Sequence, residues 1–448
     1  MFKKESALST QKMVVSEQGG QSPLWFLTGN IRVLVICRVL WSFSTSIVYP
    51  FFSLYILALG GTPAQVGIIN SLGIIAGMFL YPVGGYIADR MGRVKLVGFS
   101  TYAYAISHLF FVFADNWQTV ALGQFLSNLF LFYTPAMNAL QADSLPPGVR
   151  GRGFATIMAI PGSIRIIAPY VGGWIIASFG GGDLGMIRAV RLCWGVAFAV
   201  GLLVATIRLK FLRETITEDE ISDRLSLREL PRIFRESYRS IFESMRWMDS
   251  SLRGIVITEI VSSLFVAMTA PFWVVYAKQV VGLEPVQWGT VLLLSGAVGI
   301  IMAFPLGSLV DRVGPRRMIL IAMGLAPAVI FSYLFSGGFY GVAAILCTMS
   351  LINGMLMPAF STLIANLIPR SRRGRLYSLL GERGVMFSYG NFWGGGFLLF
   401  PAAAVGSFIG GYVYEINYAW LWMILPAAVL FNFLLAVMYI KEPERAET

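Results

Sequence analysis

The chain has 448 residues, of which 56% are hydrophobic and only 13% are charged. Soluble globular proteins carry about 25% charged residues, so this composition excludes an ordinary soluble fold. The formal net charge is +11, but the basic residues border apolar blocks, so the charge indicates orientation in a membrane rather than nucleic-acid binding. The three cysteines lie inside apolar blocks without metal-ligand or disulfide spacing, and we expect no bound metal or cofactor.

The first thirty residues are polar and mixed, and they lack the apolar core and cleavage site of a signal peptide, so we expect a cytoplasmic tail at 1–30. Apolar blocks of roughly 20 to 28 residues follow, long enough to cross a hydrocarbon core of about 30 Å. The first six blocks cover residues 31–58, 66–88, 96–114, 117–140, 153–179 and 187–208. After a charged stretch, six more cover residues 251–279, 287–310, 318–336, 339–365, 376–414 and 418–440.

These blocks predict an all-α, polytopic membrane protein with twelve transmembrane helices in two six-helix bundles, at 31–208 and 251–440. A cytoplasmic linker at 209–250 joins the bundles, and a cytoplasmic tail follows at 441–448. Lysine and arginine concentrate in the segments that are cytoplasmic if both termini are, which predicts that orientation in the plasma membrane. The linker has apolar residues at helical spacing, so we expect an amphipathic helix that faces either the bilayer or the protein's own cytoplasmic surface.

The second half of the sequence repeats the first. At an offset of 221 residues, the matches include Arg32 with Arg253, Pro50 with Pro271 and Tyr55 with Tyr276. At an offset of 222 they include Pro63 with Pro285, Gly67 with Gly289, Asp89 with Asp311, Arg90 with Arg312 and Gly92 with Gly314. Such a parallel repeat of six-helix halves is one architecture of secondary transporters.

The repeat register breaks in the block at 376–414, because Gly172-Gly173 matches Gly410-Gly411 at an offset of 238 residues. A straight helix over this block would overrun the bilayer. We therefore expect a break near Gly394–Gly396 or Pro401. The boundaries of this eleventh helix, and the depths of Glu382 and Arg383, stay open.

A loop motif lies between the second and third blocks. The segment Gly85–Lys95 reads G-Y-I-A-D-R-M-G-R-V-K and resembles the loop signature of the major facilitator superfamily, G-x-x-x-D-R-x-G-R-[RK]. A partial second copy, Gly307–Arg317, lies at the matching place in the other half. The resemblance spans residues 31–440 and implies the fold and transport activity of that superfamily.

The chemistry of this motif is suited to a gate. Gly85 lets two helices approach closely, Gly92 permits a tight turn, and Asp89 can accept hydrogen bonds from amides at a neighbouring helix N-terminus. The resemblance implies that this neighbour is the eleventh helix. It also implies that Arg93 pairs with an acid at the end of the fourth helix, here Asp143, and that this pair stabilises the outward-facing state.

The second copy of the motif is incomplete. Asn366 takes the place of Asp143, so we expect the charge lock on one side only. Arg90, Asp311 and Arg312 are further gating candidates. The alternative is that these are ordinary turn residues that follow the topology of the membrane.

The fifth block contains a second motif. Residues Ala168–Gly173 read A-P-Y-V-G-G and resemble the superfamily's antiporter-associated motif G-P-x-x-G-G, with alanine at the first position. Pro169 frees a backbone carbonyl, and Gly172 and Gly173 allow tight packing, so the segment is a candidate bend or a plain packing site. An arginine found deep in the fourth helix of many proton antiporters is missing, because Gly123-Gln124 occupies its place, which weakens the case for the usual proton relay.

Arg38, Arg165 and Glu259 lie within otherwise apolar blocks. A charge at the bilayer centre costs about 2.5 to 3.5 kcal/mol on insertion scales, so each needs a partner or a wet cavity. Glu259 is the repeat equivalent of Arg38, which favours an ion pair between the halves that substrate or a proton can break. The alternative is a static buried pair within one half. Arg165 lacks an acidic partner nearby in its own helix, and we expect it to face the cavity and attract an anionic or polar solute.

Aromatic residues cluster on the first and seventh helices, which line the cavity in this superfamily. Trp41, Tyr49, Trp273 and Tyr276 are suited to stack against organic solutes. Interfacial belts and helix packing are the commoner explanation for any single aromatic residue.

The sequence therefore predicts a secondary transporter that moves a small organic solute by alternating access, has no enzymatic activity and acts as a monomer in the lipid bilayer. Proton-coupled efflux is the first reading. Uptake or exchange of an organic anion is the alternative, favoured by the buried arginines. A receptor or sensor on a transporter-like fold is a third reading, although no large cytoplasmic signalling domain is visible.

Overall fold

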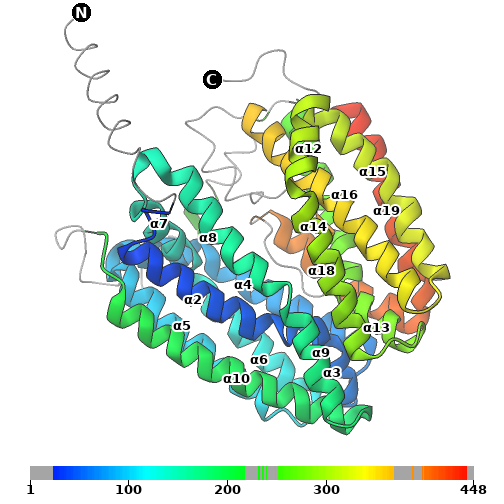
Figure 1. The fold of residues 1–448 in the computed structure, drawn as a ribbon, viewed down its shortest axis with the longest axis horizontal. Coiled ribbons are helices and arrows are strands. Elements are labelled where there is room, and N and C mark those ends of the chain that lie inside the picture. The colour runs from blue at the N-terminus through cyan, green and yellow to red at the C-terminus, as the bar shows by residue number, and fades with distance from the viewer. Residues whose placement is uncertain are drawn as a thin grey trace, which may run out of the picture.

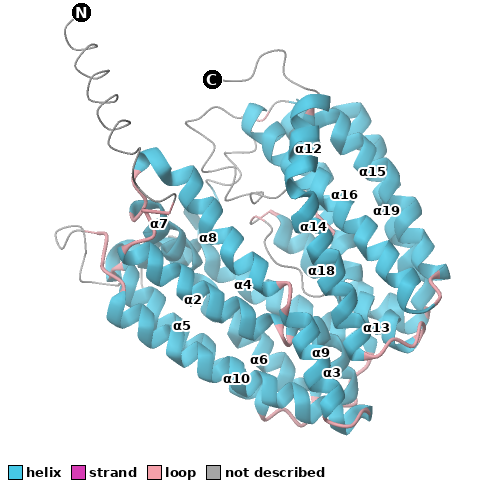
Figure 2. Ribbon diagram, in the orientation of Figure 1, coloured by secondary structure: helices cyan, strands magenta, loops and turns pink. Residues whose placement is uncertain are grey.

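The computed structural model describes residues 24–216, 250–367 and 398–440, with short pieces at 231–232, 235–236, 239, 248, 386–387 and 396. Within these residues every regular element is a helix (Figure 2). The predicted linker helix, most of both tails, and Glu382 and Arg383 lie outside the described residues. So do the side chains of Asp89 and Arg90, although the helix that carries them is described.

Each of the first six predicted blocks is helical in the structure (Figure 1). The elements of this N-terminal half are α2 (Gly29–Ser46), η2 (Tyr49–Phe51), α3 (Phe52–Ala58), α4 (Pro63–Met91), α5 (Arg93–Val112), α6 (Trp117–Leu129), η3 (Phe130–Tyr133), α7 (Thr134–Asp143), η4 (Pro147–Val149), α8 (Arg150–Arg165), α9 (Ala168–Ser178) and α10 (Gly182–Phe211). The fifth block is thus two helices, because Pro169 cannot supply a backbone N–H to continue the ladder of α8.

The C-terminal half repeats this order as far as it is described. Its elements are α12 (Ser250–Thr269), η7 (Ala270–Phe272), α13 (Trp273–Gln279), α14 (Pro285–Val313), α15 (Pro315–Phe331), η8 (Ser332–Phe335), α16 (Gly338–Leu367), α18 (Leu399–Ile416) and α19 (Tyr418–Tyr439). The break expected in the eleventh block is present, since Gly396 is not helical and α18 begins at Leu399. Pro401 lies in the first turn of α18, where a missing N–H costs nothing.

Local sequence explains why the two halves match. Pro50 and Pro271 occupy the same position in the short 3-10 turns η2 and η7, which interrupt the first and seventh helices. Pro63 and Pro285 are the first residues of α4 and α14, where proline is pre-set for a helix start. The internal repeat is therefore a repeat of structure as well as of sequence.

Among the residues that the structure describes, nine helices are long and apolar enough to cross a membrane. The other predicted spans coincide with α4, α5 and the run from α6 to α7, which are also helical. Twelve crossings are consistent with this arrangement, and the exact number stays a prediction.

The two halves form separate bundles that meet at one end of the molecule (Figure 1). Contacts between them join α4 to α18 and α9 to α14, with α3 beside α13. We call this the closed end and define it by Gly67, Gly173, Gly289 and Gly411. The opposite end, where α5 begins, α7 ends and the chain leaves α10 for the linker, is called the linker end.

Candidate functional site

At the closed end, α9 lies directly against α14. A β-carbon on Gly173 would clash with the carbonyl oxygen of Pro285, and one on Gly289 would clash with that of Pro169. Only glycine fits at these positions, because any side chain would push the helices apart. Gly172 packs in the same way on the carbonyl oxygen of Ile47, directly after α2. The motif in the fifth block is thus a packing site that joins the two halves.

The contact between α4 and α18 is the repeat equivalent of the contact between α9 and α14. A β-carbon on Gly411 would lie 2.7 Å from the carbonyl oxygen of Pro63, and one on Gly67 would lie 2.5 Å from that of Ser407. The hydroxyl of Ser407 also donates a hydrogen bond to the carbonyl oxygen of Gly67, at 3.3 Å. Gly67 is the repeat partner of Gly289, and Gly411 is that of Gly173. The closed end therefore consists of two related glycine contacts.

The halves separate away from the closed end. Gly296 of α14 still contacts the side chain of Ile166. Gly307 lies five helical turns beyond Gly289 on the same face, and a β-carbon there would meet no described atom within 4 Å. The same holds for Gly162 on α8. The two helices thus diverge toward the linker end, as Figure 1 shows.

Glu259 of α12 is the buried acid that the sequence predicts. The residue is 2% exposed, and neither carboxylate oxygen has a hydrogen-bond partner among the described residues. The predicted ion pair with Arg38 is therefore not formed in this structure, where Arg38 lies half-buried in α2. Because Arg38 and Glu259 are repeat equivalents, they lie at the same height along their helices. The repeat does not determine the direction in which either side chain points, so it does not require the two to meet.

Sequence reasoning missed the polar groups next to Glu259. The amide nitrogen of Asn432 in α19 donates to Ser262 Oγ at 2.8 Å and to the carbonyl oxygen of Thr258 at 3.4 Å. Asn432 is 1% exposed, and its Oδ1 has no partner among the described residues. An asparagine inside an apolar block was the available signal, since buried polar residues between membrane helices are rarely incidental.

Arg165 is the last residue of α8 and is exposed. Ile166 and Ile167 keep helical backbone angles, so the helical phase continues into α9. Gly172, seven residues after Arg165 and on the same face, packs on α2, while Ile166 contacts α14 through Gly296. Arg165 therefore lies on the face of this helix that Gly172 turns toward α2, next to the residue that contacts α14, and its predicted contact with a solute stays a prediction.

The aromatic candidates of the first helix pack inside the N-terminal bundle. The Trp41 ring lies 4.6 Å from that of Tyr104, centroid to centroid. The Tyr49 ring lies edge-on to Trp194 at 5.3 Å, and its hydroxyl is 3.2 Å from that of Tyr104. These contacts account for both residues by packing, and their predicted contact with a solute has no support in this conformation.

Trp273 and Tyr276 pack inside the C-terminal bundle in the same way. They are 1% and 2% exposed, and both rings contact Tyr333 and Trp422. The Tyr276 hydroxyl donates to the carbonyl oxygen of Leu334 at 3.2 Å. Helix packing, the commoner explanation of such aromatic residues, therefore accounts for Trp273 and Tyr276 in this conformation.

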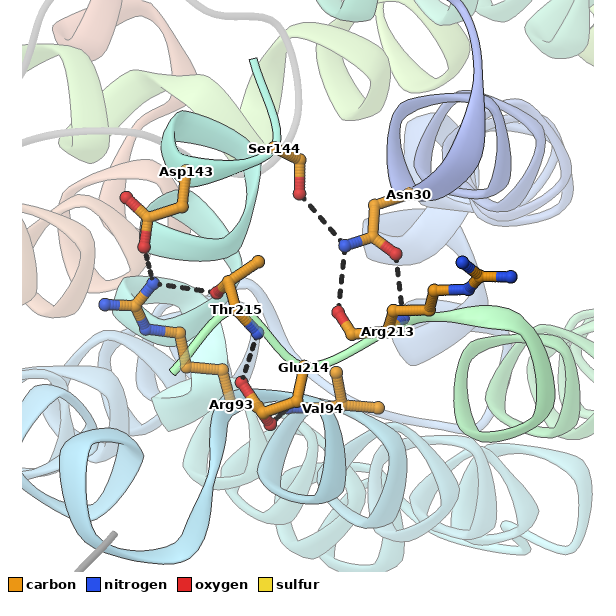
Figure 3. A network of polar contacts seen from close by, with 8 residues as sticks. All are labelled: Asn30, Arg93, Val94, Asp143, Ser144, Arg213, Glu214 and Thr215. Atoms are coloured by element: carbon orange, nitrogen blue, oxygen red, sulfur yellow. Dashed lines mark hydrogen bonds and ion pairs between the residues drawn. The ribbon is translucent and has the colours of Figure 1, made fainter. Parts of the chain in front are cut away.

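At the linker end, the loop motif forms the turn that its glycines predict. Gly92 has φ +82° and its repeat partner Gly314 has φ +96°, a backbone region that favours glycine. Arg93 directly after the first turn makes the predicted ion pair with Asp143 and also donates to Thr215 Oγ1 at 3.1 Å (Figure 3). The predicted contact is thus present, inside the N-terminal half.

The short segment that follows α10, residues 212–215, joins this network (Figure 3). The Asn30 side chain donates to the carbonyl oxygen of Arg213 at 2.8 Å and to Ser144 Oγ at 3.0 Å, and accepts from the Arg213 amide at 2.7 Å. Glu214 accepts from the Val94 amide at the start of α5, at 2.9 Å. We call this segment the strap, because it fastens the ends of α2, α5 and α7 to one another. Nothing in the apolar pattern indicated it.

The C-terminal half has no copy of this lock among its described residues. Pro315 takes the repeat position of Arg93, and the next residue, Arg316, donates from Nε to the carbonyl oxygen of Ile440 at 2.6 Å and from Nη2 to that of Val437 at 3.3 Å. Asp311 and Arg312 are exposed. The one-sided lock expected from Asn366 stays a prediction.

Arg208 is a buried cation that sequence reasoning treated only as a topology marker. It is 6% exposed near the end of α10 and donates from Nη1 to Thr101 Oγ1 at 2.6 Å and to the Tyr133 hydroxyl at 3.4 Å. Its guanidinium lies over the Tyr133 ring, 5.6 Å from the centroid. These neutral partners disperse the charge inside the N-terminal bundle.

Comparison with known proteins agrees with this architecture. Residues 34–394 match the sequence model described as the Major Facilitator Superfamily. The chain is 23% identical over 342 residues to "Multidrug resistance protein MdtG" of Proteus mirabilis, covering 74% of this chain and 80% of that one. Its fold is similar to that of a bacterial homologue of the iron transporter ferroportin, with a TM-score of 0.66, 16% identity and coverage of 94% and 100%. It is also similar to that of a mutant of the nucleoside transporter NupG, with a TM-score of 0.64, 12% identity and coverage of 92% and 100%.

Proposed function

Because the chain belongs to the Major Facilitator Superfamily, we propose that it exports small organic compounds across the plasma membrane in exchange for protons. The name of the Proteus mirabilis relative, a multidrug resistance protein, supports export. In this proposal the protein works as a monomer, with no cofactor and with both termini in the cytoplasm.

The closed end then faces the outside of the cell. The basic residues around the loop motif and the strap support this orientation, because positive charge concentrates on the cytoplasmic side. The described conformation is accordingly the one open toward the cytoplasm. In that conformation the Arg93–Asp143 pair is formed, so in this proposal the pair holds the N-terminal half rigid instead of marking the outward-facing state.

The observation that carries proton coupling is the buried carboxyl of Glu259, which has no hydrogen-bond partner among the described residues. An ionised carboxylate in such a place costs several kcal/mol, so Glu259 holds a proton in this conformation. Entry of water and solute from the linker end restores hydration and lets the proton leave toward the cytoplasm. Opening of the closed end then reloads Glu259 from outside, which links one proton inward to one solute outward.

A flux assay in proteoliposomes tests this proposal. With a cationic dye as solute, a pH gradient is expected to drive transport by the native protein and not by Glu259→Gln, which cannot release a proton. Asp183→Asn is the matched control, since Asp183 is an exposed acid at the start of α10. If Glu259→Gln retains gradient-driven transport, the assignment of the proton to Glu259 is wrong.

Organic-anion exchange is the second candidate, favoured by Arg165, an exposed cation directly before Ile166, which contacts α14 of the other half. It predicts saturable flux of an aromatic carboxylate without a pH gradient, lost in Arg165→Gln. Flux of the cationic dye alone would decide for export, whereas flux of the carboxylate alone would decide for exchange.

A further inference from the structure

A carboxylate crosses from one half of the molecule to the other at the closed end. Glu415, in the last turn of α18, accepts a hydrogen bond from the backbone amide of Ala64 in the first turn of α4, at 2.8 Å. The first amides of a helix have no carbonyl partner within it, and they carry the positive end of the helix dipole. Glu415 lies one turn beyond Gly411, which packs on the same turn of α4. The acid and the glycine contact therefore belong to one seam, α4 with α18.

The equivalent seam, α9 with α14, lacks this acid. The repeat register that matches Gly411 to Gly173 matches Glu415 to Ala177. The start of α14 has an acid of its own instead, because Glu284 precedes its first residue while Thr62 precedes that of α4. Both helix starts thus have a nearby carboxylate, but only that of α4 comes from the opposite half.

We propose that Glu415 is a positioning residue for transport, a latch that holds the α4–α18 seam of the closed end shut. The contact must break whenever the halves part at this end, since its two groups lie on different halves. The acid beside α14 lies on the same half as its helix and moves with it. The two seams, similar in backbone packing, are therefore held with unequal strength.

The expected strength suits a contact that breaks in every cycle. Glu415 is exposed, and acids at exposed helix N-termini shift an equilibrium by about two- to fivefold. A larger effect would trap the closed end, and a much smaller one would leave the seams alike.

This inference rests on the proposed alternation of the halves, and its test needs no transported solute. Hydrogen exchange of the purified protein in nanodiscs is followed for the peptides that contain residues 62–66 and 284–288. Glu415→Ala is expected to raise exchange about two- to fivefold in 62–66 and to leave 284–288 unchanged. Glu415→Gln keeps an acceptor oxygen but loses the charge, so its effect is expected to be smaller. Unchanged thermal unfolding shows that the variants fold.

A transfer of the latch provides the decisive control. The double variant Ala177→Glu with Glu284→Thr gives the α9–α14 seam the arrangement of the other seam, and slower exchange in 284–288 is expected. Equal exchange in 62–66 for the native protein and Glu415→Ala, or no protection from the transferred acid, would overturn the latch. Loss of dye transport in all proteins with the exchange pattern intact would instead overturn the proposed function.

Discussion

The two ends of the molecule are held by different kinds of contact. At the closed end, backbone meets backbone across the two halves, at Gly67, Gly173, Gly289 and Gly411, and only the side chains of Ser407 and Glu415 add described hydrogen bonds across the α4–α18 seam. At the linker end, the described polar contacts around the strap and Asp143 stay within the N-terminal half (Figure 3). One end is therefore built to come apart, and the other is built to keep one half rigid.

The difference follows from the cost of exposing or burying polar groups. Glycine contacts between helices can open without leaving a buried donor or acceptor unpaired. A network of charged and amide groups loses several hydrogen bonds when it opens, each contributing about 0.5 to 1.5 kcal/mol or more when charged. The closed end, which must open, is thus suited to glycine contacts, and the linker end of the N-terminal half, which stays together, is suited to a polar network.

The largest expected effect comes from filling one glycine contact. Gly289→Leu places a side chain against the carbonyl oxygen of Pro169, and overpacking of this kind costs about 1–3 kcal/mol. The closed end should lose roughly five- to 150-fold in relative population, and transport should fall with it. Dye flux measures this loss. Gly195→Leu, which enters open space on α10, is the control, and a similar loss there would refute the special role of the closed end.

A smaller effect is expected when the strap is released. Asn30→Ala removes three hydrogen bonds to Arg213 and Ser144 and should lower stability by about 1–2 kcal/mol. Hydrogen exchange should rise in residues 212–216 and stay unchanged in 62–66. The N-cap variant Asn116→Ala is the control, because it acts on α6 alone. A rise at both ends would mean that the two ends are coupled.

The smallest effect separates packing from solute binding. Tyr276→Phe loses one hydrogen bond to Leu334, and Tyr55→Phe loses its equivalent to Phe111. Each should cost about 0.5–1.5 kcal/mol of stability with no change in the KM for dye transport. Thermal unfolding and concentration-dependent flux measure the two quantities. A raised KM in Tyr276→Phe alone would restore that residue to the solute path.

Much of the architecture could be predicted from the sequence because it depends on position along the chain. The apolar blocks, the match of Pro50 with Pro271 and the glycine turn at Gly92 need only local chemistry, whereas the short 3-10 turns at these prolines were not predicted. The contact of Arg93 with Asp143 followed from the family resemblance.

Rotation about a helix axis could not be predicted in the same way. A membrane helix is apolar on every side, so the sequence gives no phase that separates the faces toward lipid, bundle core and solute. The predictions that depend on this phase were therefore the ones that failed: Trp41 and Tyr276 pack inside their bundles, and Glu259 does not meet Arg38. Contacts between halves, such as that of Glu415, further depend on which conformation is populated.

The interruption between α8 and α9 has a mechanical consequence. The shorter piece, α9, is fixed to α14 by Gly173, whereas α8 extends 16 residues, or about 24 Å, away from this anchor. A hinge of about 10° at Ile166–Ile167 would swing the far tip of α8 sideways by about 4 Å. A lever of this length turns a small local adjustment into a displacement wide enough to admit a water molecule or the edge of an aromatic ring.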